Sequence, residues 1–434
     1  MWVAEPAIVV EHREHLWYLL AEAAQVEHLI MCQYLYASFS LKAGPEDGLT
    51  PEQAAAVARW REVLTGIAIE EMLHLALVFN VMTAIGAAPP LSRPNFPRSS
   101  DDLPGSVQFR LLPFGTDSLT HFLYLERPEG MERMDAEGFV PAIPPREPIE
   151  PGEMISRAQD FGTVGHLYRG IERGLATLSN QFGERGLFVG PKQAQATPEL
   201  FRWPQLVAVH DMASATAAIN EIIEQGEGAR GDWQPAHYGR FLSIWNEYTR
   251  LKETDPAFEP AFPVIAAFTR QPYDIAEPQP LLTDRVTGAI AEVFNLAYEV
   301  LLQTLQRFFT HTDETDEQLQ TLVDAAFGLM AGVLRPLGRT LPRLPAGPEH
   351  PGRTAGPTFE MYYQFGNFVP WREPAWALLY ERAAILSTRS AYAATLPGAP
   401  ATAADAAAAA SRIAAQLLAH VPEELRHAPA DSAF

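Results

Sequence analysis

A strongly apolar segment of this chain contains three residues that are costly to bury. Residues 66–90, GIAIEEMLHLALVFNVMTAIGAAPP, are mainly aliphatic and aromatic, but they include Glu70, Glu71 and His74. On an α-helix, positions i and i+3 lie on one face, one turn apart. Glu71 and His74 can therefore face the same ion, and Glu70, four residues before His74, is the less favoured alternative. An ionised carboxylate on an apolar helix face is unfavourable unless it is paired or binds a metal.

The preceding helical segment has a similar feature. Apolar residues recur at spacings of three and four along residues 11–42, and Glu27 lies in the middle of that stripe. The next helix is expected at about 51–85, with Thr50 as its N-cap. Two adjacent helices thus each place a carboxylate inward. This is the first half of the dinuclear carboxylate pattern, in which one helix supplies Glu and the next supplies Glu-x-x-His.

The second half of this pattern is incomplete in the sequence. The third helix offers Glu172, and the fourth offers Glu221 and Glu224, with Glu227 nearby. No histidine stands three residues after Glu221, so a second Glu-x-x-His is absent. His237 is a candidate to replace it, because a loop could return it to the end of the bundle. A carboxylate and an imidazole together suit iron, manganese or zinc.

The order of helical and irregular segments predicts the fold class. Helical periodicity covers 11–42, 51–85, 161–182 and 204–228, and a proline-rich connection occupies 87–155. Two helices, a long crossover and two further helices are typical of an all-α, ferritin-like four-helix bundle. We therefore expect this bundle within residues 1–252, additional C-terminal helices in a companion region at 253–400, and an Ala-rich tail at 401–434 that is either a short helix or a flexible end.

The charge balance and the single cysteine restrict the partners and the compartment. The chain of 434 residues has 32 basic and 53 acidic residues and a formal net charge of −21. A phosphate backbone or an anionic membrane would be repelled, so we expect no nucleic-acid partner and no membrane partner. Cys32 is the only cysteine, which rules out an intrachain disulfide. The N-terminus lacks a basic region followed by an apolar run, so we expect a cytoplasmic protein without a signal peptide.

Several sequence runs together resemble one known family. They are AEAAQVEHLIMCQYLYASFSLK, IAIEEMLHLALVFNVMTAIGAAPP, FLYLERPE, VGHLYRGIERGL, INEIIEQGEG with the following HYGRF, and AGPTFE. In this order they resemble the ferritin-like domain of the iminophenyl-pyruvate dimer synthase family, across most of residues 10–380. That family includes the synthases of violacein- and rebeccamycin-type pathways, which oxidatively couple two imines derived from an aromatic amino acid.

The resemblance implies a ligand set and a reaction class. It suggests Glu27, Glu71 and His74 as metal ligands, and Glu172, Glu224 and His237 as candidates for the remaining positions. It also implies an iron-dependent oxidation of a small amine or imine in a ferritin-like bundle. The pathway synthases are much longer chains, so their coupling activity and their haem do not transfer to this one.

These observations lead to a functional hypothesis with two rivals. We expect a non-haem iron oxidoreductase, with two irons favoured and manganese as the alternative metal. Its partners would be a small amine, imine or aromatic substrate and O2 or peroxide, and a homodimer is allowed. Tyr34, Trp60, Phe79 and Tyr168 could line the substrate pocket, and the connection at 87–155 could cover its entrance. The rivals are metal storage and a non-catalytic partner protein, and no individual catalytic residue is identified.

Overall fold

The computed structural model describes residues 7–98, 108–137, 139, 149, 152–153, 158–228, 232–362 and 368–426. It divides into two compact units. The first comprises Met1–Pro90 and Phe96–Ala261, and the second comprises Leu91–Asn95 and Phe262–Phe434. The described residues are mostly helical, and their two named strands, β1 Val264–Ile265 and β2 Thr354–Ala355, have two residues each. The predicted all-α class is therefore confirmed.

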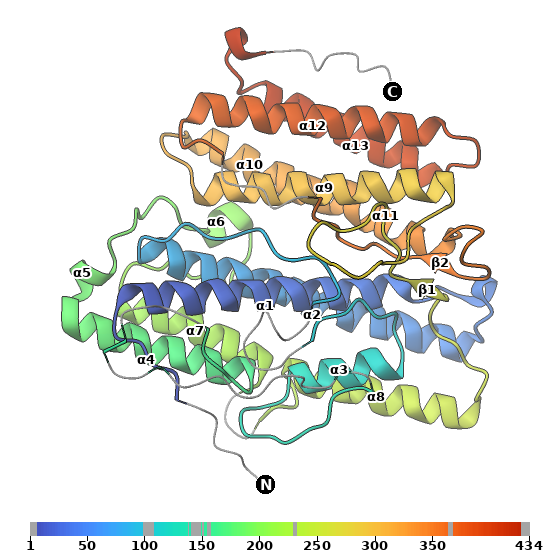
Figure 1. Cartoon of the computed structure of the whole chain (residues 1–434), viewed down its shortest axis with the longest axis horizontal. Coiled ribbons are helices and arrows are strands. Elements are labelled where there is room, and N and C mark those ends of the chain that lie inside the picture. Colours follow the sequence, from blue (N-terminus) through green and yellow to red (C-terminus); the bar gives the residue numbers. More distant parts are fainter. Residues whose placement is uncertain are drawn as a thin grey trace. The chain divides into compact units, whose positions relative to one another are not determined.

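The first unit contains the predicted four-helix bundle. Its helices are α1 Arg13–Ser40, α2 Pro51–Ala84, α4 Val164–Phe182 and α7 Met212–Gly226. The helix α1 packs against α2 and α4, and α7 packs against the same two helices, which closes the ring. Figure 1 shows α1 and α2 in blue beside α4 and α7 in green. The long connection lies between α2 and α4, as the sequence predicts.

Local capping explains where two of these helices begin. Thr50 accepts a hydrogen bond from the Gln53 backbone, Gln53 caps the Thr50 backbone in return, and Pro51 occupies the first turn of α2. The fourth helix is shorter than the predicted 204–228. It begins at Met212 because Asp211 is its N-cap and accepts a hydrogen bond from the Ser214 backbone.

Two further helices, α3 Thr116–Leu125 and α8 His237–Thr254, pack against each other. The helix α8 also contacts α2 and α7. The helix α3 belongs to the long connection, and parts of that connection, including 99–107 and 140–148, lie outside the described residues. Its role as a cover of the site therefore stays a prediction. The first unit also contains η1 Pro45–Asp47, α5 Glu184–Leu187 and α6 Pro198–Phe201.

The apolar character of α2 reflects its position inside the protein. This helix of 34 residues is long and apolar enough to cross a membrane, but 83% of its most apolar window is buried within the structure. A second segment, Asp316–Arg343, passes the same test of length and composition with 50% of its window buried. The extent of burial in α2 is typical of a core helix of a globular protein.

The second unit is also a helical array. Its principal helices are α9 Arg285–Phe309, α10 Asp316–Leu329, α12 Arg372–Thr395 and α13 Ala401–Leu418. The helix α9 packs on α10 and α12, and α13 packs on the same two helices. The Ala-rich segment is thus a helix within this unit. The shorter elements are η3 Met330–Leu334, α11 Arg335–Thr340, η4 Leu341–Arg343 and η5 Glu423–Leu425, and β1 pairs with β2 in parallel.

The boundary between the units lies after Ala261 instead of at the predicted 252/253. Contacts within the first unit account for the difference. The Gln53 side chain donates to Asp255 at 2.9 Å, and the Lys42 backbone donates to the Pro260 carbonyl at 2.8 Å. These bonds attach the chain that follows α8 to the start of α2 and the end of α1.

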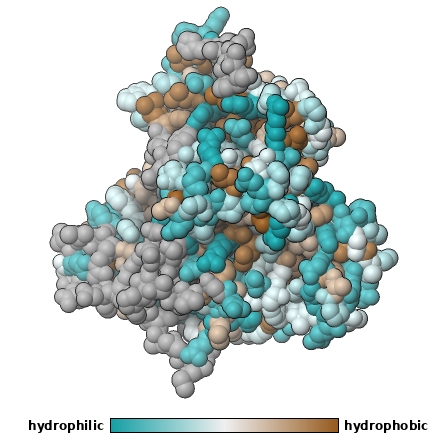
Figure 2. All heavy atoms as spheres, turned by 45° about the vertical axis from the view of Figure 1, so that its right-hand side comes forward, coloured by the Kyte–Doolittle hydropathy of each residue, from teal (hydrophilic) through white to brown (hydrophobic). Residues whose placement is uncertain are grey.

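The surface of the protein mixes residue types. Figure 2 shows hydrophobic and hydrophilic residues side by side on one face. Apolar atoms contribute more than half of the surface of an ordinary folded protein, so single exposed hydrophobic residues need no special explanation. Among the described residues of the second unit, the large hydrophobic side chains with substantial exposure are Tyr273, Leu281, Val369, Trp371, Leu378 and Tyr392.

Candidate metal centre

Three of the predicted ligands meet in the core of the four-helix bundle. Glu27 comes from the middle of α1, and Glu71 and His74 come from adjacent turns of α2. The His74 Nδ1 atom lies 2.8 Å from Glu71 Oε2 and 3.6 Å from Glu27 Oε2. All three side chains are almost completely buried. The spacing of three residues along α2 therefore places an imidazole and a carboxylate beside a carboxylate of the neighbouring helix.

A second group shares Glu71 with the first. His237 is the first residue of α8, and Glu126 directly follows α3. The His237 Nδ1 atom lies 2.9 Å from Glu71 Oε1 and 3.5 Å from Glu126 Oε2. The rings of His237 and His74 stack with their centroids 5.4 Å apart. The packing of α3 on α8 thus brings two further candidate ligands, the Glu126 carboxylate and the His237 imidazole, to the other oxygen of Glu71.

Both groups have the chemistry and the spacing of a metal site. The candidate ligand atoms of Glu27, Glu71 and His74 lie within 4.8 Å of one another, and so do those of Glu71, Glu126 and His237. Glu27 Oε2 is buried without a hydrogen-bond partner, and Glu71 Oε1 and His237 Nδ1 lie 2.9 Å apart as an ion pair that lacks hydrogen-bond geometry. An unpartnered buried polar atom is costly, and a bound cation would remove that cost. Each of these two overlapping groups could therefore hold a metal ion.

The remaining oxygens of the ligand carboxylates are held by tyrosines. Tyr168 of α4 donates its hydroxyl to Glu27 Oε1 at 2.5 Å, and Tyr34 of α1 donates to Glu126 Oε1. Burial raises the pKa of both phenols well above the usual value, so both remain protonated donors. Each tyrosine fixes one oxygen and leaves the other free for a ligand, which is how outer partners orient metal-binding carboxylates.

The outer nitrogens of both imidazoles are also held. His237 Nε2 lies 2.9 Å from Glu70 Oε2, and Arg240 donates to the same carboxylate. Although partial burial opposes it, hydrogen bonds from His237 and Arg240 lower the pKa of Glu70 to about 2. Glu70 is therefore an orienting partner of His237, and the preference for Glu71 as the residue facing His74 agrees with the structure. His74 Nε2 lies 3.0 Å from the Gln225 amide oxygen.

The electrostatics of the centre are those of a crowded set of acids and bases. Burial, followed by the nearby Glu71 charge, raises the pKa of Glu27 to about 8. Burial alone would also raise the pKa of Glu71, but His237 and His74 lower it well below the usual value. Burial would lower the pKa of His74, whereas the charges of Glu71 and Glu27 raise it to about 10. Without a metal, protons compensate these carboxylates, and metal binding would displace them.

The structure brings together four of the seven predicted ligands: Glu27, Glu71, His74 and His237. It does not bring in Glu172, which is half-buried on α4, because Tyr168 and Ile171 occupy the inward face of that helix. On α7 the inward face carries Ile219, Ile222 and Ile223 instead of acids. Glu224 is therefore exposed, and Glu221 is half-buried and accepts a hydrogen bond from Gln225 at 2.5 Å.

The sequence reasoning missed Glu126 and gave little weight to Glu227. Glu126 lies in the run FLYLERPE, which was recognised as part of a helix but not as a source of ligands. Glu227 lines the void of about 20 Å³ at the centre and accepts a hydrogen bond from the Gly165 backbone at 2.9 Å. Burial raises its pKa to about 7. An acid that ends an apolar helical run could have indicated Glu126, whereas Glu227 stands between Gly226 and Gly228 and carries no such signal.

Comparison with known proteins gives the following matches. Residues 20–246 match the family model described as Ferritin-like. The chain is 30% identical over 389 residues to dichlorochromopyrrolate synthase of Lentzea aerocolonigenes. This alignment covers 81% of this chain and 36% of the relative. The chain is also 27% identical over 374 residues to 2-imino-3-(indol-3-yl)propanoate dimerase of Chromobacterium violaceum. This second alignment covers 80% of this chain and 34% of the relative.

The chain thus spans about a third of the length of these two curated relatives. A crystal structure of a ferritin like protein from Caulobacter vibrioides aligns with 74% of this chain and 95% of that chain, with 18% sequence identity and a TM-score of 0.46.

Proposed function

Because this chain belongs to the ferritin-like family, we propose that it is a metal-dependent oxidoreductase with two ions bound in the core of the bundle. Glu27, Glu71 and His74 would hold one ion, and Glu71, Glu126 and His237 would hold the other. The observation that carries the proposal is the convergence of buried carboxylates and imidazoles on Glu71 in two overlapping groups, with Glu27 Oε2 left without a hydrogen-bond partner.

Iron is the proposed metal, with manganese as the alternative. Three carboxylates and two imidazoles form a mixed oxygen and nitrogen set without a thiolate, which suits these ions. When bound, such a pair of ions would supply the redox chemistry for the reduction of O2 or peroxide. The three carboxylates would neutralise three of the four positive charges of two divalent ions. The neutral imidazoles would neutralise none of them.

The residues around the ligands would exclude water and fix geometry. Ile30, Leu125, Val164, Ile222 and Ile223 line the void together with the acids and imidazoles. The void measures about 20 Å³, which is room for one or two waters or ions and not for a larger solvent pool. Exclusion of water strengthens electrostatic interactions inside such a site and suppresses side reactions.

A small aromatic amine or imine is the proposed substrate class. One relative is named for a substrate that combines an indole, an imine and a carboxylate. In the proposed reaction the substrate loses two electrons and two protons, and O2 is reduced to hydrogen peroxide, or peroxide is reduced to two waters. The dimerisation that the relative is named for remains outside the proposal, because this chain spans only about a third of that protein.

Metal content of matched variants tests this proposal. We expect about two irons per chain, by elemental mass spectrometry, in protein expressed with iron and never exposed to a histidine-affinity resin. Glu71→Ala should remove both ions, because Glu71 belongs to both groups. The control Glu224→Gln changes an exposed acid of α7 and should retain both.

Oxygen consumption provides the functional readout. With the imine formed from indole-3-pyruvate and ammonia, the wild-type chain should consume O2 and the Glu71→Ala variant should not. Metal-free wild-type protein without O2 turnover would contradict the proposal and favour a non-catalytic partner protein. Iron-loaded protein in a large hollow assembly, measured by light scattering, would favour metal storage instead.

A further inference from the structure

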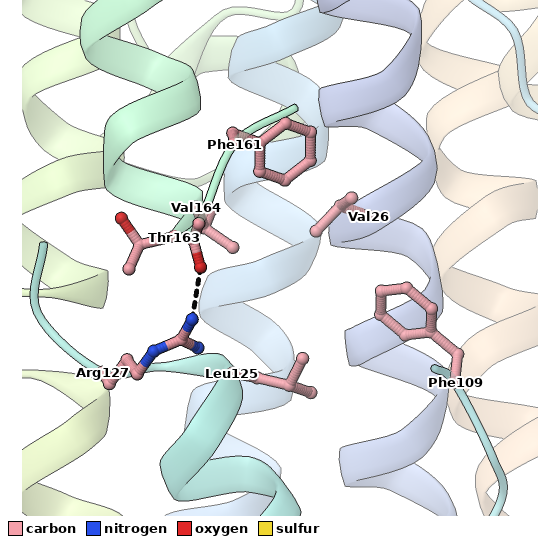
Figure 3. Close-up of a pocket in the computed structure, with 8 residues that line it drawn as sticks. Val26, Phe109, Leu125, Arg127, Phe161, Thr163 and Val164 are labelled. Carbon is pink, nitrogen blue, oxygen red and sulfur yellow. Dashed lines mark hydrogen bonds between the residues drawn. The ribbon is translucent and has the colours of Figure 1, made fainter. Parts of the chain in front are cut away.

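An apolar pocket lies beside the metal centre and contains one cationic side chain. We call it the side pocket, and it is lined by Val26, Phe109, Leu125, Arg127, Phe161, Gly162, Thr163 and Val164. In Figure 3, Arg127 lies on one side, Val26 and Phe109 lie on the other, and Leu125 and Val164 lie between them. One charged group facing several apolar side chains is the usual composition of a site for a small amphipathic ligand.

The side pocket adjoins the proposed reaction centre. Leu125 and Val164 line both the side pocket and the void that contains the metal-ligating atoms. Leu125 directly precedes the candidate ligand Glu126, and Val164 is the first residue of α4. A ligand in the side pocket would therefore be separated from the metal centre by a single layer of side chains.

Arg127 is buried without an acidic partner. The residue is only 9% exposed. Its guanidinium donates to the Tyr124 and Gly162 carbonyls and lies 3.9 Å from the centroid of the Tyr124 ring. No carboxylate pairs with it among the residues that the structure describes. Since a buried guanidinium without a counter-ion is costly, and since only two of its five N–H groups are used here, it has the capacity to bind an anion.

The start of α4 adds to the positive potential. The helix runs from Val164 to Phe182, so its N-terminal dipole lies at the side pocket beside Gly162 and Thr163, and Glu227 accepts a hydrogen bond from its first turn at Gly165 on the side of the metal centre. The Arg127 guanidinium presents a planar fork that matches the two oxygens of a carboxylate. The charge, the fork and the helix terminus all favour the same type of ligand group.

We propose that the side pocket binds the carboxylate end of a small aromatic acid, with Arg127 as its counter-ion. The aromatic ring would lie against Val26, Phe109 and Phe161. The carbon next to the carboxylate would then face Leu125 and Val164, on the side of the metal centre. The choice of a 2-oxo or 2-imino acid as the ligand rests on the proposed function. The free volume of the pocket is about 10 Å³, so binding requires side chains such as Phe161 to move apart.

Binding of phenylpyruvate, a stable 2-oxo acid, tests the proposal by titration calorimetry on the metal-loaded full chain under argon. Arg127→Gln should weaken phenylpyruvate binding at least tenfold, because a charge-assisted bidentate contact is lost. Arg127→Lys keeps the charge but not the fork and should give an intermediate loss. Arg173→Gln makes the same change at an exposed position of α4 and should leave the affinity unchanged.

A comparison of ligands on the wild-type chain covers the case in which Arg127→Gln does not fold. The methyl ester of phenylpyruvate has no charge and should bind at least tenfold more weakly than the acid. Equal affinity for acid and ester, or a folded Arg127→Gln variant with wild-type affinity, would overturn the proposal. Circular dichroism establishes whether the variant is folded.

This test separates the side pocket from the proposed function. Arg127-dependent phenylpyruvate binding in a chain that holds no iron and consumes no O2 would support the pocket and contradict the oxidoreductase. A chain with two irons and O2 turnover that does not bind phenylpyruvate at millimolar concentration would support the oxidoreductase and contradict the side pocket. Direct chelation of phenylpyruvate by the metal would be insensitive to Arg127→Gln and would count against the pocket.

Discussion

The two units of this protein both bury charged residues, but they treat them differently. In the second unit, Arg307 and Glu314 are almost fully buried and bond to each other, and Trp376 also donates to Glu314 at 3.0 Å. In the first unit, Glu27 and Glu71 are equally buried; Glu27 Oε2 has no hydrogen-bond partner, and Glu71 Oε1 faces His237 Nδ1 at 2.9 Å without hydrogen-bond geometry. Fully paired charges stabilise a fold, whereas buried carboxylates with unused oxygens indicate a site for a ligand.

The unpartnered atoms of the two units also differ in kind. Within the described residues, those of the second unit belong to amides and hydroxyls: Gln303, Gln306, Thr354 and Thr358. Those of the first unit include carboxylates and imidazoles, which bind metals. A pocket or a buried charge alone would not separate the units, but the chemical type of the unpartnered atoms does.

The largest expected effect is on the buried ion pair of the second unit. Arg307→Met leaves Glu314 charged and buried, and we expect a loss of about 3–5 kcal/mol in the free energy of unfolding. The double variant with Glu314→Met should recover most of that loss. Urea unfolding followed by circular dichroism measures both, and metal content should remain at the wild-type value. Loss of metal in Arg307→Met would break the distinction between the two units.

An effect of intermediate size is the pH-dependent contribution of Glu360, also in the second unit, to the free energy of unfolding. Burial raises its pKa from 4.5 to about 7, although Thr269 and Asn295 donate hydrogen bonds to it. The folded state therefore binds the proton more tightly than the unfolded state. This contribution is fully present below pH 4.5 and is lost as the pH rises to about 7, by up to about 3 kcal/mol.

Glu360→Gln should remove this pH dependence. The difference in unfolding free energy between wild type and variant should change by up to the same amount from pH 4.5 to 7, and it should stay constant above pH 8. Urea unfolding at a series of pH values gives that difference. A pH-independent difference would show that three hydrogen bonds keep the Glu360 carboxylate ionised, and that the second unit holds a fully compensated charge there too.

The smallest effect is expected at an outer partner of the metal centre. Tyr168→Phe removes the hydroxyl that fixes Glu27 Oε1, and we expect metal affinity to fall by roughly 10- to 100-fold with little loss of fold stability. Competition with a chelator of known affinity measures the change. Tyr248→Phe, a buried tyrosine of α8 in the same unit, is the control and should bind metal like wild type. Equal affinity of both variants would show that the tyrosine does not orient the ligand.

Helical periodicity predicted the half of the centre that one short-range rule can describe. Glu71 and His74 are one turn apart on α2, and Glu27 lies in the apolar stripe of α1, so helical periodicity places each of them on an inward face. The bundle topology was also predictable, and the family match over residues 20–246 confirms it. The predicted resemblance to the synthases is confirmed by the two curated relatives. His237 was predicted as a replacement ligand, and the structure places it at the centre.

The other half depends on packing that periodicity does not encode. The dinuclear pattern predicts acids on the third and fourth helices, and therefore Glu172, Glu221 and Glu224 as ligands. In this protein those helices present Tyr168 and a row of isoleucines inward, and α3 and α8 deliver Glu126 and His237 from outside the ring. Tertiary contacts with α8 determine the position of α3 within the long connection, and the local sequence carries little information about that position.

Glu71 belongs to both ligand groups, and this has a consequence for how the centre fills. The first ion to bind would deprotonate the surrounding groups and fix the Glu71 carboxylate in the orientation that the second ion needs. Occupancy of one site would therefore change the affinity of the other, because a pre-oriented Glu71 favours the second ion whereas repulsion between the two cations opposes it.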